Sequence, residues 1–167
     1  NDPVRALAAI VNDAYVGRLF TSAVTCTSAD GCNYIAKWDG SGWSALGSGM
    51  GGSYPRVSAL AVSGTNLYAG GVFITAGGVP ANHVAKWDGS MWSALGEGIG
   101  GPVWAPSVFA LAVSGTNLYV GGQFTKAGGV AANNIAKWDG TAWSPLGAGM
   151  SSYVYALAVS GTNLYAG

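Results

Sequence analysis

The sequence predicts an all-β fold built from repeated four-stranded antiparallel units. Three near-copies of one segment occur at Tyr34–Gly47, His83–Gly96 and Asn134–Gly147. Each copy has a short apolar strand, an Asp-Gly turn and a second strand that Trp opens, which is the pattern of a β-hairpin. The leucines of four Ala-Leu-Ala strands are 53, 51 and 46 residues apart: Leu7, Leu60, Leu111 and Leu157. A period of about 50 residues is that of a β-propeller blade.

The third unit shows the expected order of strands most regularly. The first strand is Val108–Ser114, the turn is Gly115–Asn117, and the second strand is Leu118–Phe124. A longer loop reaches Ala132 and is followed by the Trp hairpin, which supplies strands three and four. Because antiparallel strands alternate in direction, the tight turns share one end of the sheet and the longer loops share the other. Variation between units is concentrated in those longer loops.

We expect about three and a half blades in residues 1–167. The blades are assigned to 4–56, 57–107 and 108–153, with a half blade at 154–167, which gives 14 strands. The first unit diverges most, because Val11–Ala14 replaces the Ser-Gly-Thr-Asn turn and Gly17-Arg18 replaces a Gly-Gly pair.

The residues at the strand ends resemble those of the kelch-type β-propeller repeat. An aromatic residue and a Gly pair close the second strand at Tyr68–Gly71 and Tyr119–Gly122, and Trp43, Trp92 and Trp143 open the fourth strand. The phrase Ile-Ala-Lys-Trp-Asp-Gly, followed by Trp-Ser and Leu-Gly, is similar to bacterial cell-surface propeller repeats and to those of fungal cortical polarity-marker proteins. The resemblance implies blades arranged around a central channel with the first strand innermost. It departs at Gly17-Arg18 and in the loop from Cys26 to Cys32.

A four-stranded sheet with two apolar faces cannot bury itself and must pack against neighbouring sheets. We expect large rings to fill the space between blades: Trp38, Trp43, Trp87, Trp92, Trp138, Trp143, Tyr68, Tyr119, Tyr165, Phe73 and Phe124. Three and a half blades leave two uncovered faces, which invites association. Either the native polypeptide continues past Gly167 or copies assemble into a closed ring, and both alternatives stay open.

Charge is scarce and balanced, with seven basic and seven acidic side chains. This balance argues against nucleic-acid and anionic-membrane partners. No apolar run reaches the roughly 18 residues that cross a bilayer, so we expect no membrane span. The chain opens on Asn1 rather than Met, which is expected of a processed secreted chain or of a piece of a longer one.

Cys26 and Cys32 enclose five residues of a predicted surface loop. The span can be closed by a disulfide, which would indicate an extracellular or cell-surface protein. A metal pair is the first alternative, although two thiols and one carboxylate fall short of a four-ligand zinc site. Two free thiols in a cytosolic protein are the second.

The inventory of catalytic groups predicts a protein that is not an enzyme and holds no cofactor or metal. The chain has one His (His83), one Glu (Glu97) and six Asp, so no catalytic triad can be assembled. His83 stands where Tyr34 and Asn134 stand in the other units, as a loop-edge residue. The Tyr, His and Cys ligands of the kelch-like copper oxidases cannot be matched here.

Repeated charged residues have structural explanations. Asp39, Asp88 and Asp139 each precede Gly at a tight turn, where a carboxylate accepts backbone N–H hydrogen bonds. Lys37, Lys86 and Lys137 lie two residues before those Asp on the same strand face, so an ion pair between them is expected.

The longer loops between units carry a candidate binding face. Tyr54, Trp104 and Tyr153 lie in these loops, outside the repeat pattern. Loop aromatics on a rigid scaffold can stack on sugar rings or on a peptide, although they can also pack under their own loops. We therefore expect a scaffold that contacts a protein partner or further copies of itself. A carbohydrate-binding propeller is the alternative, and a hydrolase or oxidase has the least support.

Overall fold

The computed structural model describes residues 5–17, 29, 31–102 and 105–167. Within these residues the regular elements are β-strands, β1 to β20, and every pairing between them is antiparallel. The all-β, antiparallel prediction is therefore confirmed. In the described part of the chain, no helix is long and apolar enough to cross a membrane.

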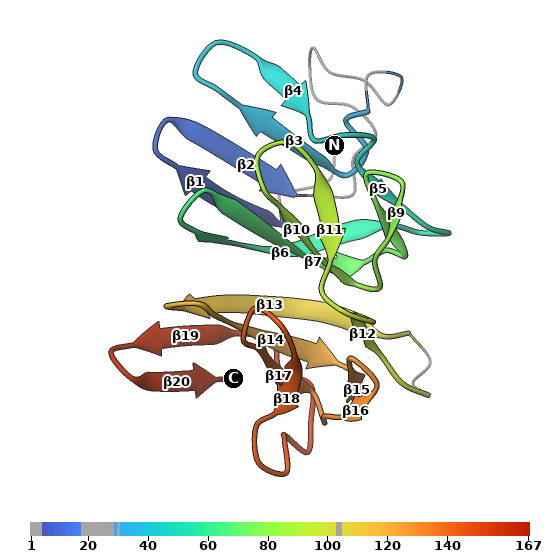
Figure 1. Ribbon diagram of the computed structural model, residues 1–167, viewed down its shortest axis with the longest axis vertical. Coiled ribbons are helices and arrows are strands. Elements are labelled where there is room, and N and C mark those ends of the chain that lie inside the picture. The colour runs from blue at the N-terminus through green and yellow to red at the C-terminus, as the bar shows by residue number, and fades with distance from the viewer. Residues whose placement is uncertain (1–4, 18–28, 30, 103–104) are drawn as a thin grey trace.

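Three four-stranded sheets form the body of the molecule (Figure 1). The first sheet contains β1 (Ala6–Ile10), β2 (Asp13–Gly17), β3 (Ile35–Trp38) and β4 (Trp43–Ala45). The second contains β6 (Arg56–Ser63), β7 (Asn66–Val72), β10 (Val84–Trp87) and β11 (Trp92–Ala94). The third contains β13 (Ser107–Ser114), β14 (Asn117–Gln123), β17 (Ile135–Trp138) and β18 (Trp143–Pro145). A two-stranded fourth sheet contains β19 (Leu157–Ser160) and β20 (Asn163–Ala166).

Two further sheets of very short strands lie in the longer loops, where we expected irregular chain. One contains β5 (Met50–Gly51), β8 (Thr75–Ala76) and β9 (Val79–Pro80), and the other contains β12 (Ile99–Gly100), β15 (Lys126–Ala127) and β16 (Val130–Ala131). In each, the loop that leaves one unit pairs with a loop inside the next. The N–H of Gly77, for example, donates to the carbonyl of Gly49 at 2.7 Å. These sheets join adjacent units at one end.

Adjacent four-stranded sheets approach closely where their first strands lie side by side. The strand β6 packs beside β1 and β13, and β13 packs beside β19. At each contact a valine lies over a glycine of the preceding sheet: Val57 over Gly17, Val108 over Gly70, and Val154 over Gly121. A Cβ at any of these three glycines would collide with the valine, so the close approach requires glycine there.

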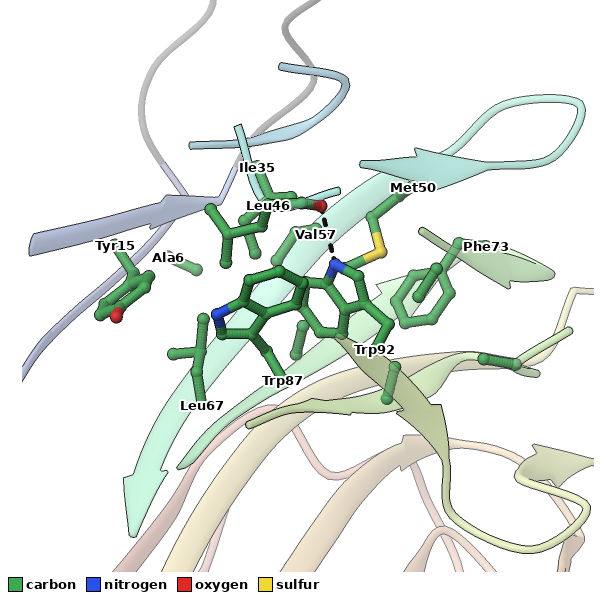
Figure 2. Close-up of a cluster of buried hydrophobic side chains, with 14 residues drawn as sticks. Ala6, Tyr15, Ile35, Leu46, Met50, Val57, Leu67, Phe73, Trp87 and Trp92 are labelled. Atoms are coloured by element: carbon green, nitrogen blue, oxygen red, sulfur yellow. Dashed lines mark hydrogen bonds between the residues drawn. The ribbon is translucent and has the colours of Figure 1, made fainter. Parts of the chain in front are cut away.

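The core consists of layers between successive sheets. Between the first and second sheets, Tyr15 and Leu46 pack with Trp87, Trp92 and Phe73 (Figure 2). The layer between the second and third sheets contains Tyr68, Leu95, Phe124 and Trp143, with Trp138 packed against it. The tryptophans of each unit thus face the preceding unit, and its strand-two tyrosine faces the following one. A four-stranded sheet with these residues needs a neighbour on both sides.

Candidate functional site

A tryptophan hydrogen bond crosses each layer between units. The indole Nε1 of Trp92 donates to the carbonyl of Leu46 at 2.8 Å (Figure 2), and that of Trp143 donates to the carbonyl of Leu95 at 2.7 Å. Both bonds are buried. Their geometry repeats because each Trp opens the fourth strand of its sheet and each Leu lies three residues after the equivalent Trp of the preceding unit.

The first sheet carries the equivalent tryptophan without an equivalent acceptor. Trp43 is half-buried, and its indole forms no hydrogen bond with any residue that the structure describes. It contacts Trp38, with ring centroids 5.5 Å apart, as Trp87 contacts Trp92 in the second sheet. We call the surface made by Trp38 and Trp43 the Trp face.

The opposite end of the molecule carries the complementary acceptor. Leu146 is equivalent to Leu46 and Leu95, but it is only half-buried and no described Trp donates to its carbonyl. Met150 is 41% exposed, whereas the equivalent Met50 is 3% exposed. Tyr165 is likewise exposed, and Tyr119 is half-buried. We call the surface made by Leu146 and Met150 the Leu face.

The structure separates the three loop aromatics that were predicted to form a binding face. Tyr54 is strongly exposed and makes no ring contact with another described aromatic residue. Tyr153 packs its ring edge-on against Tyr155, with centroids 6.3 Å apart. Trp104 lies outside the described residues. Of the three, Tyr153 alone belongs to an aromatic cluster in the part of the chain that the structure describes.

Sequence reasoning missed the other members of that cluster. Tyr155 stacks on Phe109 with centroids 5.0 Å apart and ring planes 7° from parallel. Both rings line a cavity of about 430 Å³, together with Arg5, Arg56 and Ser58. The signal that could have revealed these residues is their variation at one position of otherwise similar repeats.

The cavity-lining residues of the first strands occupy β-bulges. Pairing between β6 and β7 skips Ser58, and pairing between β13 and β14 skips Phe109. In the fourth sheet, the N–H groups of Tyr155 and Ala156 both donate to the carbonyl of Gly167, at 2.7 and 2.8 Å. A bulge leaves one residue outside the regular pairing and redirects its side chain. Here the side chains of Ser58, Phe109 and Tyr155 line one cavity.

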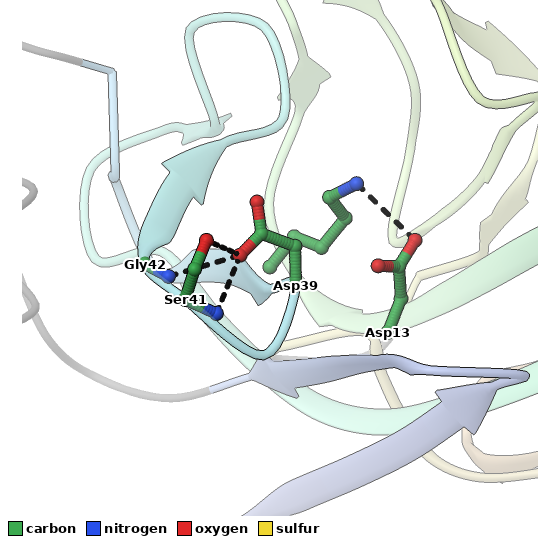
Figure 3. A network of polar contacts seen from close by, with 5 residues as sticks. Asp13, Asp39, Ser41 and Gly42 are labelled. Atoms are coloured by element: carbon green, nitrogen blue, oxygen red, sulfur yellow. Dashed lines mark hydrogen bonds and ion pairs between the residues drawn. The ribbon is translucent and has the colours of Figure 1, made fainter.

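The aspartates before glycine stabilise tight turns, as expected. Asp39 Oδ1 accepts hydrogen bonds from Ser41 Oγ at 2.7 Å and from the N–H groups of Ser41 and Gly42 at 2.9 Å (Figure 3). These bonds, the Ser41 hydroxyl first, lower the pKa of Asp39 to about 2. Hydrogen bonds from the N–H groups of Ala142 and Thr141 lower the pKa of Asp139 to about 2 as well.

The expected ion pair between Lys37 and Asp39 is wrong. Lys37 Nζ instead lies 3.2 Å from Asp13 Oδ2 (Figure 3), and this is the one ion pair among the described residues. Asp39 is engaged by its own turn, and Asp13 replaces the Asn66 and Asn117 of the next two units. Asp13, the charged residue that is specific to the first unit, is therefore paired with a lysine on the neighbouring strand β3.

His83 lies at a loop edge in a left-handed conformation that its counterparts share. Its φ is 65°, against 67° for Tyr34 and 61° for Asn134. Burial lowers the pKa of His83, and its Nδ1 is buried without a hydrogen-bond partner among the described residues. Asn134 fits the position better, because its Nδ2 donates to the carbonyl of Met150 at 3.0 Å. No group of three or more His, Cys, Asp or Glu that could hold a metal ion occurs among the described residues.

The predicted disulfide lies partly outside the described residues. Cys32 is fully buried, next to Ala36 and Trp43, and Cys26 is outside the described ranges. The pairing of Cys26 with Cys32 therefore stays a prediction.

Comparison with known proteins places the fold and nothing more. No protein-family model and no curated protein matches the sequence. Among solved structures, the chain is similar to the computationally designed Ika4 protein, with a TM-score of 0.59 and 17% identity over 99% of this chain and 84% of that one. It is also similar to the computationally designed Ika8 protein, with a TM-score of 0.60 and 22% identity over 98% of this chain and 42% of that one. At such identities the likeness concerns the fold alone.

Proposed function

We propose that this chain is part of a kelch-like β-propeller that works as a non-enzymatic scaffold outside the cell or at its surface. In this proposal the four-stranded sheets are blades, about three and a half in number. Its open Trp and Leu faces bind further blades, which other copies of the chain supply. The observation that carries the proposal is the indole bond to a leucine carbonyl. It occurs twice among the described residues, in which Trp43 is the equivalent indole and Leu146 the equivalent leucine carbonyl that lack such a bond.

The two open faces are complementary because each reproduces one half of an internal layer. Leu46 is met by the outer hairpin of the following sheet, whereas β19 and β20 supply only the inner half of the sheet that follows Leu146. If the outer hairpin of another copy completed that sheet, its Trp43 would lie against Leu146 as Trp92 lies against Leu46. Met150 would then be covered as Met50 is. Burial of these apolar side chains would contribute about 25 cal/mol for each Å² removed from water. Such a contact is heterologous, so the copies form either a closed ring or an open filament.

The mass of the particle in solution tests this proposal. We expect sedimentation velocity to show a species larger than one chain, with a mass that rises with protein concentration. Met150→Lys should reduce it to single chains, because a charge would have to be buried in the new layer. Met91→Lys is the matched control, since Met91 is also exposed but lies in the tight turn between β10 and β11. Equal masses for both variants would contradict the Leu face as the contact surface.

Mixing two variants tests the polarity of the contact. Trp43→Glu should disable the Trp face and Met150→Lys the Leu face, so that each variant alone is a single chain. In a mixture, the Trp43→Glu variant keeps an intact Leu face and the Met150→Lys variant keeps an intact Trp face. The two variants should therefore form a one-to-one dimer. That dimer also shows that both variants fold. A mixture that stays at the mass of single chains would refute the head-to-tail contact.

Carbohydrate binding is the second candidate function. It is favoured by one observation, the cluster of Tyr153, Tyr155 and Phe109 beside a cavity of about 430 Å³. Cavities of this size bind small molecules, and exposed rings can stack on sugars. Tyr155→Ala should weaken binding to any saccharide that the protein captures from a glycan array. An array on which no saccharide is captured would remove this function.

A further inference from the structure

One position in the first strand of each unit differs in every repeat. It lies between a Val and an Ala that repeat in all four units, and it is occupied by Arg5, Ser58, Phe109 and Tyr155. The repeated Val57, Val108 and Val154 are held in place by the glycines that they cover. The variable residue has no such packing role, because the bulge turns it out of the regular pairing. Packing between the sheets therefore does not fix the residue type at this position.

These four residues meet at one cavity although they are up to 150 residues apart in the sequence. Arg5, Ser58, Phe109 and Tyr155 all line the cavity, with Arg56 as the fifth lining residue. Convergence follows from the side-by-side packing of the first strands β1, β6, β13 and β19. A site built by one residue from each unit is asymmetric, because no two of its members are alike.

The charged side chains that line the cavity are positive among the residues that the structure describes. Two of the seven basic side chains in the molecule line it, and no described acidic residue does. Neither Arg5 nor Arg56 forms an ion pair with a described residue. The cavity of about 520 Å³ near β12 is different, because Glu97 and Lys126 both line it. Unpaired guanidinium groups in a concave site are suited to bidentate binding of a carboxylate or phosphate.

The aromatic side of the cavity offers a flat apolar surface. Phe109 and Tyr155 are nearly parallel, and Tyr155 is 64% exposed, so the ring surface extends to solvent. The ring plane of Tyr153 lies 75° from that of Tyr155, with centroids 6.3 Å apart. A pyranose ring has a face of C–H groups that can lie flat on such a ring. An inorganic anion or an acidic amino-acid side chain has no comparable flat apolar face.

We propose that this cavity binds a saccharide that carries carboxylates, of the hexuronate class. Arg5 and Arg56 would donate paired hydrogen bonds to the carboxylate of the sugar, and Tyr155 would hold the face of the pyranose ring. Ser58 supplies a hydroxyl that can bond to a ring hydroxyl. This inference rests on carbohydrate binding, the second candidate function, and it specifies the chemical class of the ligand.

Titration calorimetry with two matched ligands tests the inference. The probes are a trisaccharide of galacturonate and the corresponding trisaccharide of galactose, which lacks the carboxylates. We expect the acidic trisaccharide to bind at least about tenfold more tightly, because charge-assisted hydrogen bonds are the stronger kind. Arg56→Gln should lower its affinity about tenfold or more. Lys126→Gln, which removes a positive charge elsewhere, should leave the affinity unchanged.

Each other outcome overturns the inference in a distinguishable way. Equal affinity for the two trisaccharides, or an unchanged affinity in Arg56→Gln, would exclude carboxylate recognition while carbohydrate binding stood. Tighter binding of poly-glutamate than of the acidic trisaccharide would show a peptide site instead. Binding of neither trisaccharide would remove carbohydrate binding as well. Unchanged urea midpoints for Arg56→Gln and Lys126→Gln would show that both variants fold.

Discussion

Replacing Gly70 by alanine tests how closely the second and third sheets pack. A Cβ at Gly70 would collide with Cγ1 of Val108 and lie 3.1 Å from its Cβ and 3.3 Å from Cδ1 of Leu111. Val108 is fully buried, and rotation about χ1 of its β-branched side chain is restricted, so it has little room to turn away. Overpacking of this kind costs about 1–3 kcal/mol. Removing a glycine from a strand returns roughly 0.5–1 kcal/mol, so the net loss is about 0.5–2 kcal/mol.

Thermal and urea unfolding measure that loss. A chain of this length should lose about 1–8 °C in melting temperature, at about 2–4 °C for each kcal/mol. The matched control is Gly167→Ala, the equivalent position in the fourth sheet, where a Cβ meets no atom within 4 Å. Adding Val108→Ala to Gly70→Ala should cost less than the two separate changes predict, because the methyl group then has room. Strict additivity in this cycle, or a Gly70→Ala variant as stable as the control, would refute the packing argument.

Three further predictions concern the tryptophan bond, the turn aspartates and the cysteines. Trp92→Phe should lower the free energy of unfolding by about 0.5–1.5 kcal/mol, because it removes a buried hydrogen bond to the carbonyl of Leu46, which keeps the N–H of Gly49 as a donor at 3.2 Å. Trp43→Phe should cost less in the isolated chain, and equal urea midpoints would contradict this. The carbon-13 chemical shift of the Asp39 carboxyl should change with pH around a midpoint of about 2 rather than 3.8. Because folding lowers this pKa, the ionised Asp39 carboxylate contributes fully to stability above about pH 4, and this contribution is lost as the pH falls through about 2. In Asp39→Asn, the free energy of unfolding should therefore fall less over that pH range. Thiol labelling of the unfolded chain should modify neither Cys26 nor Cys32 before reduction and both afterwards, and two labels without reductant would argue against the disulfide and the extracellular location.

The repeated hairpins were predictable because large, distinctive residues mark them. The Asp39-Gly40 turn and the tryptophans on its two sides specify β3 and β4, and the equivalent residues specify the hairpins of the next two units. The strands β5 and β8 were not predictable, since each has two residues and exists only where loops of neighbouring units meet. A pattern of alternating residues cannot appear in two positions. Their pairing is a result of the tertiary structure.

The ion-pair partner of Lys37 and the residues that line the cavity of about 430 Å³ were missed for a similar reason. Asp13 is 24 residues from Lys37 in the sequence, and the two meet because β2 pairs with β3. The candidate face was sought among loop aromatics, so Tyr153 was identified and its neighbours Tyr155 and Phe109 were not. Those two lie at the first strands, where a repeat pattern predicts packing. The bulges that redirect them are visible only in the register of the strands.

Packing and recognition place opposite demands on neighbouring residues of the same strand. Val57 must fit Gly17 in the preceding sheet, so the residue at this position is the same in every unit. Ser58, its neighbour at the bulge, meets no such requirement and faces the cavity. A substitution at the bulge should therefore alter the chemistry of the cavity at little cost in stability, whereas one at the valine weakens the contact between sheets. This separation explains how nearly identical repeats can line one cavity to which every unit contributes a different residue.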